Sequence, residues 1–550
     1  MLPRPRAFPA VALLLLLQPV FAQKPAPQEK KPARPKDLAG EISFILSQPE
    51  LARAHWGIDV MDLETGKAIY SLNPAQLFTP ASNAKLLTTA AALSVAGPDY
   101  RFRTTIEAEG PIENGRLQGD LVIAGRGDPN ISGRVMPLAL KPERVPPHTQ
   151  ILEEMADQVA RSGLKAVDGD VIGDDTFYSP QRYADGWSQD DLQWIDGAPV
   201  SALTFNDNVI FVDVAPGEHA GDKALVTTEP ETAYFEIDNR IVTSAGGIAR
   251  KVGVHRDPGS KRILLWGTLP LGDNGLKEPL AVEDPAEATA QIFRGLLERR
   301  GIAVNRKARA RHQETAQFFD QATAGVTAPS SRRCCPRMEM TTPTASPTPP
   351  PATPSPTPIP AAHTTILAEH ISLPFIEDVR VINKTSQNLH AELALRLAGK
   401  LSGNGGSFEG GTAAVRQFLL QAGLAEDSFV LLDGSGLSRR DLVTPEGVVQ
   451  LLAYARRQPW GAAYEDSLPI AGIDGSLAER LVSSPAAGLV HAKTGTLSHV
   501  SALSGYGQTL DGRRFAFSIF CNNHDLPTPK VLAAIDAIVT ALVNNSEKPR

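Results

Sequence analysis

The chain has 550 residues, of which 42% are hydrophobic, and a formal net charge of −7 at pH 7. This length exceeds the roughly 100–200 residues of a typical domain, so we expect two to four domains. The modest negative charge, without a large basic block, makes nucleic acid a poor candidate partner, and three cysteines are too few for a disulfide framework.

The first segment combines basic residues with a short apolar run. Arg4 and Arg6 precede a leucine-rich run that is too short to span a bilayer with ease, and small residues follow it. This pattern predicts a signal peptide over 1–22, cut near Ala22–Gln23, with a transmembrane anchor as the alternative. We therefore expect an exported protein, periplasmic or secreted, with no integral membrane segment after signal removal. Lysines and prolines over 23–37 predict a flexible tether.

The pattern of apolar residues after the tether changes along the chain and predicts different secondary structure in successive segments. Residues 56–74 predict two strands around a Glu-Thr-Gly-Lys turn. An apolar helix follows, which starts near Ser82 and should end at Gly97–Pro98. From there on, short apolar runs are broken by Gly, Asp and Pro, which predicts a β-rich insertion over 101–315.

A Thr/Pro/Ser-rich stretch then interrupts the chain. Residues 316–362, which include two adjacent cysteines, have little to bury and predict an internal linker. Excising 341–362 should therefore leave activity and melting temperature nearly unchanged. Helical patterns and strands return over 363–550 and close with an amphipathic helix. We expect an α+β fold in which 38–100 and 363–550 form one helix-and-sheet domain, split by the β-rich insertion.

Ser82 and Lys85 lie three residues apart at the start of the predicted helix, so their side chains share one helix face. A lysine partly desolvated by apolar neighbours can be neutral and take the proton of a serine hydroxyl, which would prepare Ser82 for acyl transfer. The alternative is an N-capping serine with a solvated lysine. Ser162 and Lys165 repeat the spacing, but no helix follows them, and we interpret Ser162 as a helix end.

Two downstream segments supply what an acyl-transfer site without histidine still needs. Ser386 and Asn388, just before a predicted helix, offer a second hydroxyl for proton transfer and an amide for the substrate backbone. The other segment is a predicted strand with a cation, a glycine and two hydroxyls: Lys493, Thr494, Gly495 and Thr496. The cation and hydroxyls can bind a carboxylate, and the glycine would let a substrate strand approach closely. No HExxH, CxxC or phosphate-binding Gly-rich loop occurs, so metal and nucleotide sites are not expected.

The three elements occur together in penicillin-binding proteins and class A β-lactamases. Further stretches strengthen this likeness: GRGDPNIS (125–132), GAPVSALTFNDN (197–208), DGSGLSR (433–439), LPIAGIDGSL (468–477) and HAKTGTL (491–497). The chain thus resembles the class C low-molecular-mass penicillin-binding proteins, which are D-alanyl-D-alanine carboxypeptidases/endopeptidases with a large insertion between the first and second motifs. The resemblance covers most of the mature chain.

The resemblance implies a serine DD-peptidase that forms an acyl-enzyme with peptidoglycan stem peptides, at their D-Ala-D-Ala end or at D-Ala cross-links. The implied roles are nucleophile (Ser82), base (Lys85), proton route to the leaving D-Ala (Ser386 with Lys493), substrate-amide ligand (Asn388) and carboxylate ligands (Thr494 and Thr496). The backbone N–H groups of Ser82 and Thr496 would form the oxyanion hole. β-Lactam antibiotics would be covalent inhibitors, and no cofactor is implied.

Acidic and aromatic residues cluster in the insertion at GWSQDDLQWIDG. We hypothesise that Trp187, Asp190, Arg439 and Ser498 line a pocket for the amine and carboxylate of a diaminopimelate-type stem residue; solvated loop charges are the alternative. His491, next to the strand motif, is interpreted as structural, because no pattern places an Asp partner beside it.

Two rival functions are considered. A β-lactamase would share the serine and both lysines but needs a deacylating water, and neither a Glu-x-x-Leu-Asn segment nor a Tyr-x-Asn that would position one is found. A non-catalytic cell-wall-binding protein would not be acylated at Ser82. The sequence leaves open the balance between carboxypeptidase and endopeptidase activity.

Overall fold

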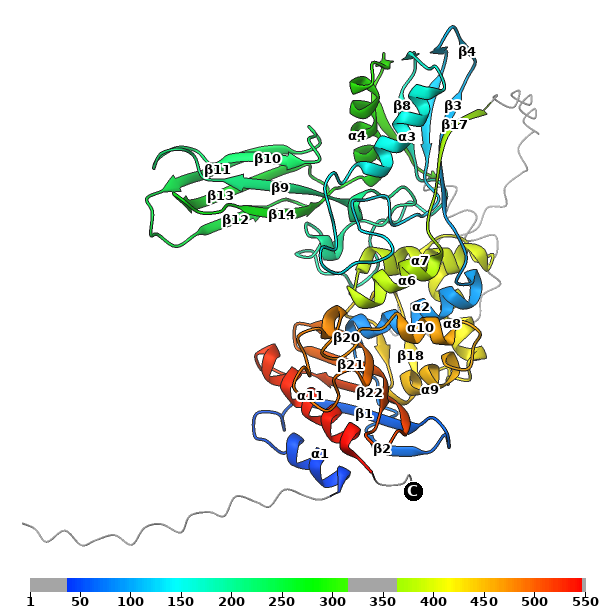
Figure 1. The fold of residues 1–550 in the computed structure, drawn as a ribbon, viewed down its shortest axis with the longest axis vertical. Coiled ribbons are helices and arrows are strands. Elements are labelled where there is room, and N and C mark those ends of the chain that lie inside the picture. Colours follow the sequence, from blue (N-terminus) through cyan, green and yellow to red (C-terminus); the bar gives the residue numbers. More distant parts are fainter. Residues whose placement is uncertain (1–36, 315–363, 547–550) are drawn as a thin grey trace, which may run out of the picture.

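The computed structural model describes residues 37–314 and 364–546 (Figure 1). Four predicted features lie outside the described residues: the signal peptide (1–22), nearly all of the tether (23–37), the linker (316–362) and the cysteines Cys334 and Cys335. Across the described ranges, no helix combines the length and the apolar character needed to cross a bilayer.

The two ends of the described chain build one antiparallel sheet with the strand order β2-β1-β22-β21-β20. Its strands are β1 (His55–Asp62), β2 (Ala68–Leu72), β20 (Val490–Leu497), β21 (Val500–Gln508) and β22 (Arg514–Asn522). The predicted strand pair around the Glu-Thr-Gly-Lys turn is therefore confirmed as β1 and β2. Helices α1 (Leu38–Leu46) and α11 (Thr528–Asn544) pack together beside this sheet (Figure 1).

Strand β22 shows how the sheet separates two cores. Successive side chains of a strand point to opposite faces. Phe515, Phe517 and Ile519 pack into the core shared with α1 and α11, whereas Ala516 and Phe520 pack into the core on the other face. The sheet is thus buried on both sides, which explains the nearly continuous apolar run of this strand.

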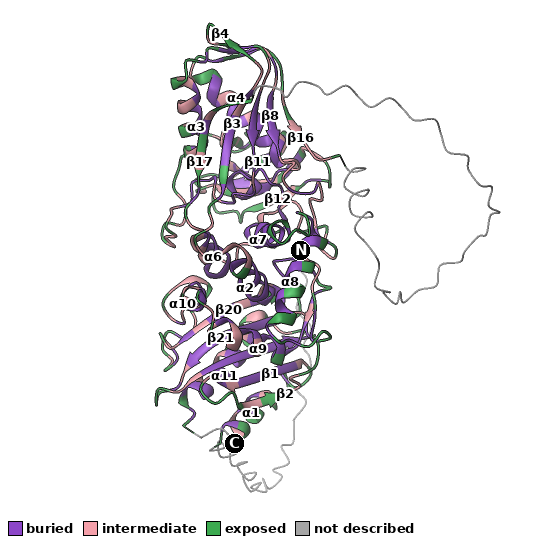
Figure 2. Cartoon of the chain, turned by 90° about the vertical axis from the view of Figure 1, so that its right-hand side faces the viewer, coloured by how far each residue is buried: buried purple, intermediate pink, exposed green. Residues whose placement is uncertain are grey.

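The second face is covered by a layer of helices: α2 (Ala84–Ala96), α6 (Phe375–Lys384), α7 (Asn388–Leu401), α8 (Phe408–Gln421), α9 (Pro445–Ala455) and α10 (Gly461–Asp466). Figure 2 shows buried residues along α2 and α7, which lie between the sheet and the insertion. Helix α2 is buried all round from Ala84 to Leu93, which accounts for its lack of a polar stripe. It ends at Gly97, whose φ of 78° confirms the predicted helix end.

The insertion contains two bodies, each with its own core. In the first, helices α3 (Gln150–Arg161) and α4 (Pro285–Arg299) pack on a sheet with the order β16-β8-β6-β3-β17. The strands of this sheet are β3 (Arg103–Glu109), β6 (Asp120–Ala124), β8 (Val171–Asp174), β16 (Ala308–Arg311) and β17 (Thr364–Ile371). A smaller sheet beside it contains β4 (Ile112–Glu113), β5 (Arg116–Leu117), β7 (Ala166–Val167) and β15 (Ala303–Val304).

The second body projects from the molecule as an arm of two three-stranded sheets (Figure 1). Its strands are β9 (Val209–Ala215), β10 (Leu225–Glu229), β11 (Glu236–Ser244), β12 (Lys251–His255), β13 (Arg262–Pro270) and β14 (Leu276–Ala281). A short pair, β18 (Phe429–Val430) and β19 (Leu442–Val443), lies in the helical layer. Helices and strands thus both build the molecule, in agreement with the α+β class expected from the sequence.

Strand β17 changes one expected boundary. It pairs with β3 inside the sheet of the insertion, although the sequence analysis assigns everything from residue 363 to the second part of the helix-and-sheet domain. The run TTILAEHI predicts a strand but carries no information about which sheet that strand joins. In this structure the chain leaves the insertion only after Ile371.

Candidate active site

Ser82 lies in a short 3-10 turn, η1 (Ala81–Asn83), that leads directly into α2. The turn is fixed against β20 because Asn83 Nδ2 donates a hydrogen bond of 3.1 Å to the Lys493 carbonyl oxygen. The first turn of α2 therefore faces the strand that carries the Lys-Thr-Gly sequence. This contact joins residues that are 410 positions apart in the chain.

Lys85 is completely buried, and its Nζ donates to three acceptors: Ser82 Oγ at 2.8 Å, Asn388 Oδ1 at 2.6 Å and the Ser435 carbonyl oxygen at 2.8 Å. Burial disfavours the ammonium and lowers the pKa of Lys85 to about 8, although nearby carboxylates oppose this shift. A lysine with this pKa is a suitable general base for the neighbouring hydroxyl near neutral pH.

Two buried carboxylates shape the loop that presents the Ser435 carbonyl. Glu392 on α7 accepts hydrogen bonds of 2.8 Å from the backbone N–H groups of Gly434 and Ser435. Asp433 accepts from the N–H groups of Gly436 and Ser438 at 2.7 Å each. Burial, reinforced by the Asp433 charge, raises the pKa of Glu392 to about 8. The loop around DGSGLSR is thus held from inside the protein.

Lys493 on β20 contacts the second serine of the predicted trio. Its buried Nζ donates to Ser386 Oγ at 2.8 Å and to the Thr494 carbonyl oxygen at 2.9 Å. Burial, together with the Lys85 charge, holds the pKa of Lys493 well below its ordinary value. Ser386 has a φ of 64°, a left-handed conformation that is unfavourable for a serine. Two lysine–serine pairs therefore lie in the same site.

These groups open onto one cavity of about 390 Å³. Its lining comes from all three predicted motifs, from the DGSGLSR loop and from the insertion: Ser82, Asp191, Asp196, Thr385, Ser386, Asn388, Gly436, Leu437, Arg439, Thr494, Thr496, Leu497 and Ser498. Thr494 Oγ1 lies 2.7 Å from Ser476 Oγ, and Thr496 is exposed. The structure thus brings the hydroxyls of both lysine–serine pairs to one solvent-accessible space, with the two lysines buried behind them.

Asn388 uses both ends of its amide. Its oxygen accepts from Lys85, and its nitrogen donates to the Asp196 carbonyl oxygen of the insertion at 2.9 Å. The residue therefore links the base to the insertion, a contact that the sequence analysis did not predict.

The structure gives a reason for Gly495 that the sequence analysis did not predict. A Cβ at this position would lie 2.7 Å from the Pro80 carbonyl oxygen and 2.9 Å from Asn83 Nδ2. The glycine is required because β20 packs directly against the turn that carries Ser82. The close neighbour on this side is the protein's own backbone, and the approach of a substrate strand stays a prediction.

The four residues proposed for a stem-peptide pocket are only partly gathered. Arg439 and Ser498 line the cavity, and Arg439 Nη1 donates to the Ser498 carbonyl oxygen at 3.2 Å. Asp190 is exposed and accepts from Ser188, and its pKa is lowered by that hydrogen bond and by Arg439. Trp187 is half-buried and donates from Nε1 to Asp433 at 2.8 Å. Trp187 and Asp190 do not line the cavity itself.

Other predicted residues lie elsewhere. Ser162 caps the C-terminal end of α3, and its hydroxyl donates to the Val159 carbonyl oxygen, as expected of a helix end. His491 is the second residue of β20 and lies opposite Tyr506 of β21. Within residues 37–314 and 364–546, no group of three or more His, Cys, Asp or Glu side chains is arranged to hold a metal ion.

Several site residues were missed by the sequence analysis: Ser435, Glu392, Asp433, Asp191 and Asp196. Asp433 and Ser435 lie in DGSGLSR, and Asp191 and Asp196 lie in GWSQDDLQWIDG; both segments had been noted, but no role was assigned to these four residues. Ser435 contributes a backbone carbonyl, Glu392 and Asp433 contribute buried side chains, and Asp191 and Asp196 line the cavity; motif spacing reveals none of these contributions.

The family model and the similar proteins all point to D-alanyl-D-alanine carboxypeptidases. Residues 38–323 and 357–544 match the D-Ala-D-Ala carboxypeptidase 3 (S13) family. A D-alanyl-D-alanine carboxypeptidase of Actinomadura sp. is 34% identical over 549 residues, which cover 98% of this chain and 90% of that relative. The D-alanyl-D-alanine carboxypeptidase DacB of Haemophilus influenzae is 24% identical over 475 residues, or 85% of each chain.

A solved structure shares the fold. The crystal structure of penicillin binding protein 4 (dacB) from Haemophilus influenzae matches with a TM-score of 0.71 at 22% identity and covers 92% of this chain and 99% of that chain. A second structure of that protein, complexed with a β-lactam, matches with a TM-score of 0.65 over the same shares. The insertion and the helix-and-sheet part are therefore both shared with a known fold.

Proposed function

The chain belongs to the D-Ala-D-Ala carboxypeptidase 3 (S13) family and is a serine peptidase, and from this premise we propose that Ser82 is its nucleophile. The observation that carries the proposal is the 2.8 Å hydrogen bond between Ser82 Oγ and the buried Nζ of Lys85. Family membership also favours a peptidase over the two rival functions, a β-lactamase and a non-catalytic cell-wall-binding protein.

The proposed reaction begins when neutral Lys85 takes the proton of Ser82. The Ser82 oxygen attacks the carbonyl carbon of the penultimate D-Ala, and the backbone N–H groups of Ser82 and Thr496 stabilise the oxyanion. The carbon–nitrogen bond then breaks, and Ser386 passes a proton from Lys493 to the leaving amine of the terminal D-Ala. Water finally hydrolyses the ester and releases the shortened peptide. No metal or cofactor enters this scheme.

The substrate ligands follow the same geometry. The Asn388 amide nitrogen carries two hydrogens; one donates to Asp196, and the other is assigned to a substrate carbonyl. Thr494 and Thr496 at the cavity wall are assigned to the terminal carboxylate. Removal of the terminal D-Ala and cleavage of D-Ala cross-links both use this chemistry, because each breaks the bond on the carbonyl side of D-Ala.

The pocket for the stem residue is proposed at the rim of the cavity, from Trp187, Asp190, Arg439 and Ser498. Support comes from the cavity position of Arg439 and from its electrostatic effect on Asp190. Asp190→Asn should reduce the preference for peptides with a diaminopimelate-type side chain over uncharged analogues. A variant with full preference would contradict this assignment.

The domain arrangement and localisation complete the proposal. We propose that 38–100 and the chain after Ile371 form the penicillin-binding domain and that the insertion with β17 is a separate unit; support comes from their separate cores. The basic and apolar pattern of 1–22 supports an exported, periplasmic or secreted enzyme that acts on peptidoglycan.

Acylation by a β-lactam tests the nucleophile. A β-lactam mimics the D-Ala-D-Ala end, so intact-protein mass spectrometry should show one penicilloyl adduct per chain, on the peptide that contains Ser82. Ser82→Ala should abolish the adduct, and Lys85→Ala should nearly abolish it, because the hydroxyl then has no base. Ser162→Ala, the control with the same Ser-x-x-Lys spacing, should leave it unchanged. An adduct on another peptide would refute the assignment.

A further inference from the structure

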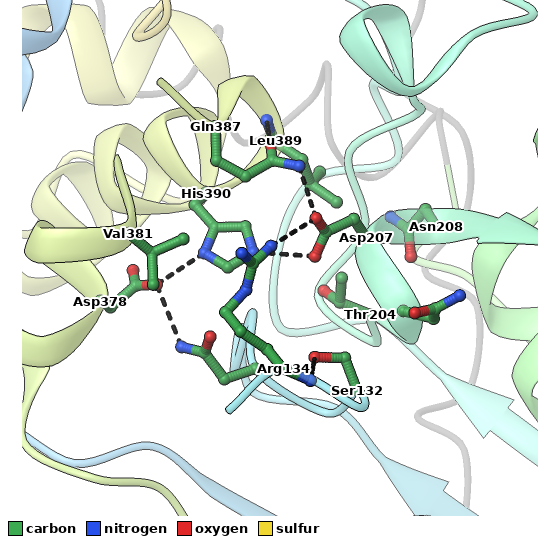
Figure 3. A network of polar contacts seen from close by, with 12 residues as sticks. Ser132, Arg134, Thr204, Asp207, Asn208, Asp378, Val381, Gln387, Leu389 and His390 are labelled. Carbon is green, nitrogen blue, oxygen red and sulfur yellow. Dashed lines mark hydrogen bonds and ion pairs between the residues drawn. The ribbon is translucent and has the colours of Figure 1, made fainter. Parts of the chain in front are cut away.

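A buried group of charged side chains joins the insertion to the start of α7. Figure 3 shows His390 of α7 between Asp378 of α6 and Asp207, which the insertion contributes from its NDN sequence. Asp207 and His390 are completely buried. These residues do not line the catalytic cavity, and the proposed chemistry does not use them.

His390 is held on both ring nitrogens. Nδ1 lies 2.6 Å from Asp378 Oδ1, and Nε2 lies 3.0 Å from Asp207 Oδ1. Because both partners are carboxylates, both nitrogens act as donors and the ring is an imidazolium. Burial opposes this charge, but the two carboxylates raise the pKa of His390 above its ordinary value.

Two arginines also form ion pairs with Asp207, in addition to the His390 imidazolium. Arg134 Nη2 donates to its Oδ2 at 2.7 Å, and Arg144 forms a second ion pair with the same oxygen. Although burial opposes ionisation, Arg144, Arg134 and His390 hold the pKa of Asp207 well below its ordinary value. Asp207 is therefore a permanent buried anion whose position is fixed from several sides.

Gln387 connects this anion to the start of α7, where Ser386 and Asn388 contact the two lysines. Its Nε2 donates to Asp207 Oδ2 at 2.6 Å, and its Oε1 accepts from the Leu389 N–H at 2.8 Å and so caps α7. Gln387 lies between Ser386 and Asn388 in the chain. Each neighbour contacts one of the two catalytic lysines, so a shift of Gln387 would move both contacts.

Both chain segments at this junction have left-handed backbone. Ser386 has a φ of 64°, and Asn206, Asp207 and Asn208 have φ values of 49°, 54° and 57°. Such conformations persist where the surrounding contacts enforce them, and they concentrate at functional sites. Asn and Asp tolerate this region, whereas Ser386 depends on its surroundings to stay there.

We propose that Asp207, His390 and Gln387 form a clamp through which the insertion positions Ser386 and Asn388 against the catalytic lysines. This inference rests on the proposed function of Ser82. The clamp residues are positioning residues, because none of them contacts the reacting atoms. Displacing a catalytic group by about 1 Å can cost about 10²-fold in rate, so the effect of losing the clamp should appear in the chemical step.

An exchange of amide and carboxylate tests the clamp. Gln387→Glu places two carboxylates against each other, and Asp207→Asn leaves the cations without their shared anion. In the double variant the amide and the carboxylate have exchanged places, which restores the donor–acceptor pair between positions 387 and 207 and the net charge of the group; Arg134 and Arg144, which donate to the same oxygen as Gln387, then have the carboxylate at position 387 as their nearby anion. Stopped-flow acylation of the full chain by a fluorescent penicillin separates the binding constant from the acylation rate constant.

We expect each single variant to lower the acylation rate constant by about 10- to 100-fold with little change in the binding constant. The double variant should be faster than either single variant, which is the signature of direct coupling. Single variants that are folded and acylate at the wild-type rate would overturn the proposal. A double variant slower than both single variants would overturn it as well.

Three further variants test whether a general loss of structure explains the slower acylation. Gln387→Ser retains an N-cap acceptor but removes the donor to Asp207, so it should slow acylation even if Asp207→Asn fails to fold. His312 is the matched control, because it also bridges two carboxylates, Asp175 at 2.8 Å and Asp284 at 2.9 Å, within the insertion. His312→Gln should lower the melting temperature and leave the acylation rate constant unchanged, whereas His390→Gln should reduce that constant.

The outcomes also separate this inference from the proposed function. If wild-type Ser82 forms no penicilloyl adduct, the proposed nucleophile is wrong. If wild-type Ser82 is acylated normally and the Gln387 and Asp207 variants are acylated equally fast, only the clamp is wrong.

Discussion

Lys85 uses all three hydrogens of its ammonium group, on Ser82, Asn388 and the Ser435 carbonyl, so it must lose a proton before it can accept one. Burial sets the pKa of this group at about 8. The acylation rate constant should therefore rise about tenfold per pH unit below pH 8 and level off above it, because the neutral fraction sets the rate. A stopped-flow pH profile measures this, and a rate that falls through the same range would contradict Lys85 as the base.

Asp196 offers a way to move the midpoint of that profile without changing a buried residue. Its carboxylate is at the cavity wall and, after Asp433 and Glu392, raises the pKa of Lys85. Asp196→Asn should therefore shift the midpoint to lower pH, because the ammonium loses a stabilising charge. Asp185→Asn, which removes an exposed carboxylate paired with an arginine, is the control and should leave the midpoint unchanged. An unshifted midpoint in Asp196→Asn would mean that another group controls the profile.

At the scale of elements, the site depends on the close approach of β20 to the turn before α2. Gly495→Ala would place a Cβ 2.7 Å from the Pro80 carbonyl oxygen, which must push the strand away from Ser82. We expect a destabilisation of about 1–3 kcal/mol. We also expect a slower acylation by about 10- to 100-fold, since Lys493 moves with the strand. Thermal unfolding and stopped-flow acylation measure the two effects.

Gly295→Ala is the matched control for this substitution. Gly295 lies inside α4, far along the chain from the motifs, and a Cβ there meets nothing within 4 Å. Alanine should stabilise that helix by up to about 1 kcal/mol and leave acylation unchanged. If Gly495→Ala behaved like Gly295→Ala, the proposed steric limit between β20 and the turn would be wrong.

The elements that the sequence predicted well are those determined by neighbouring residues. The β1–β2 turn, the end of α2 at Gly97 and the final helix α11 follow from local patterns of apolar residues and glycines. The three motifs were also found, because each is a short local spacing. The pairing of β17 with β3 of the insertion was not predicted, since pairing between distant strands has no local signature.

The hydrogen bonds that hold the motif residues in place could not be predicted either, because they join segments that are far apart in the sequence. Trp187 donates to Asp433 across 246 positions, and Gln387 donates to Asp207 across 180. Such contacts depend on how the insertion docks, and a single sequence does not record it. Glu392 illustrates the difficulty: on the sequence it is one charged residue in an apolar helix, and in the structure it holds the loop that faces Lys85.

At the scale of the whole molecule, the expected tolerance to excision of 341–362 can be given a geometric basis. Between the described ranges lie the 49 residues 315–363, and they connect β16 and β17, which are the two edges of one five-stranded sheet. These edges are about 19 Å apart across the sheet, from four strand spacings of about 4.8 Å. Because β16 and β17 run parallel, the connection also has to return along the length of the sheet, which adds about 26 Å for the eight residues of β17. The 27 residues left after excision can reach about 90 Å at about 3.3 Å per residue.

We therefore expect the shortened protein to match the full chain in acylation rate and to melt within a few degrees of it. Differential scanning calorimetry and penicillin acylation provide the measurements. A large drop in melting temperature would show that the excised residues contribute to the folded core.

The sheet order β2-β1-β22-β21-β20 also has a consequence for how the protein is made. Strand β1 pairs with β22, so His55 waits for Asn522, roughly 470 residues later in synthesis, and contacts between such distant segments form slowly. Strand β20, which carries Lys493, and its neighbours β21 and β22 all follow residue 489 in the sequence. A chain that stops before β20 lacks Lys493 and the carbonyl that fixes the turn of Ser82, so we expect a variant truncated at residue 489 to form no penicilloyl adduct.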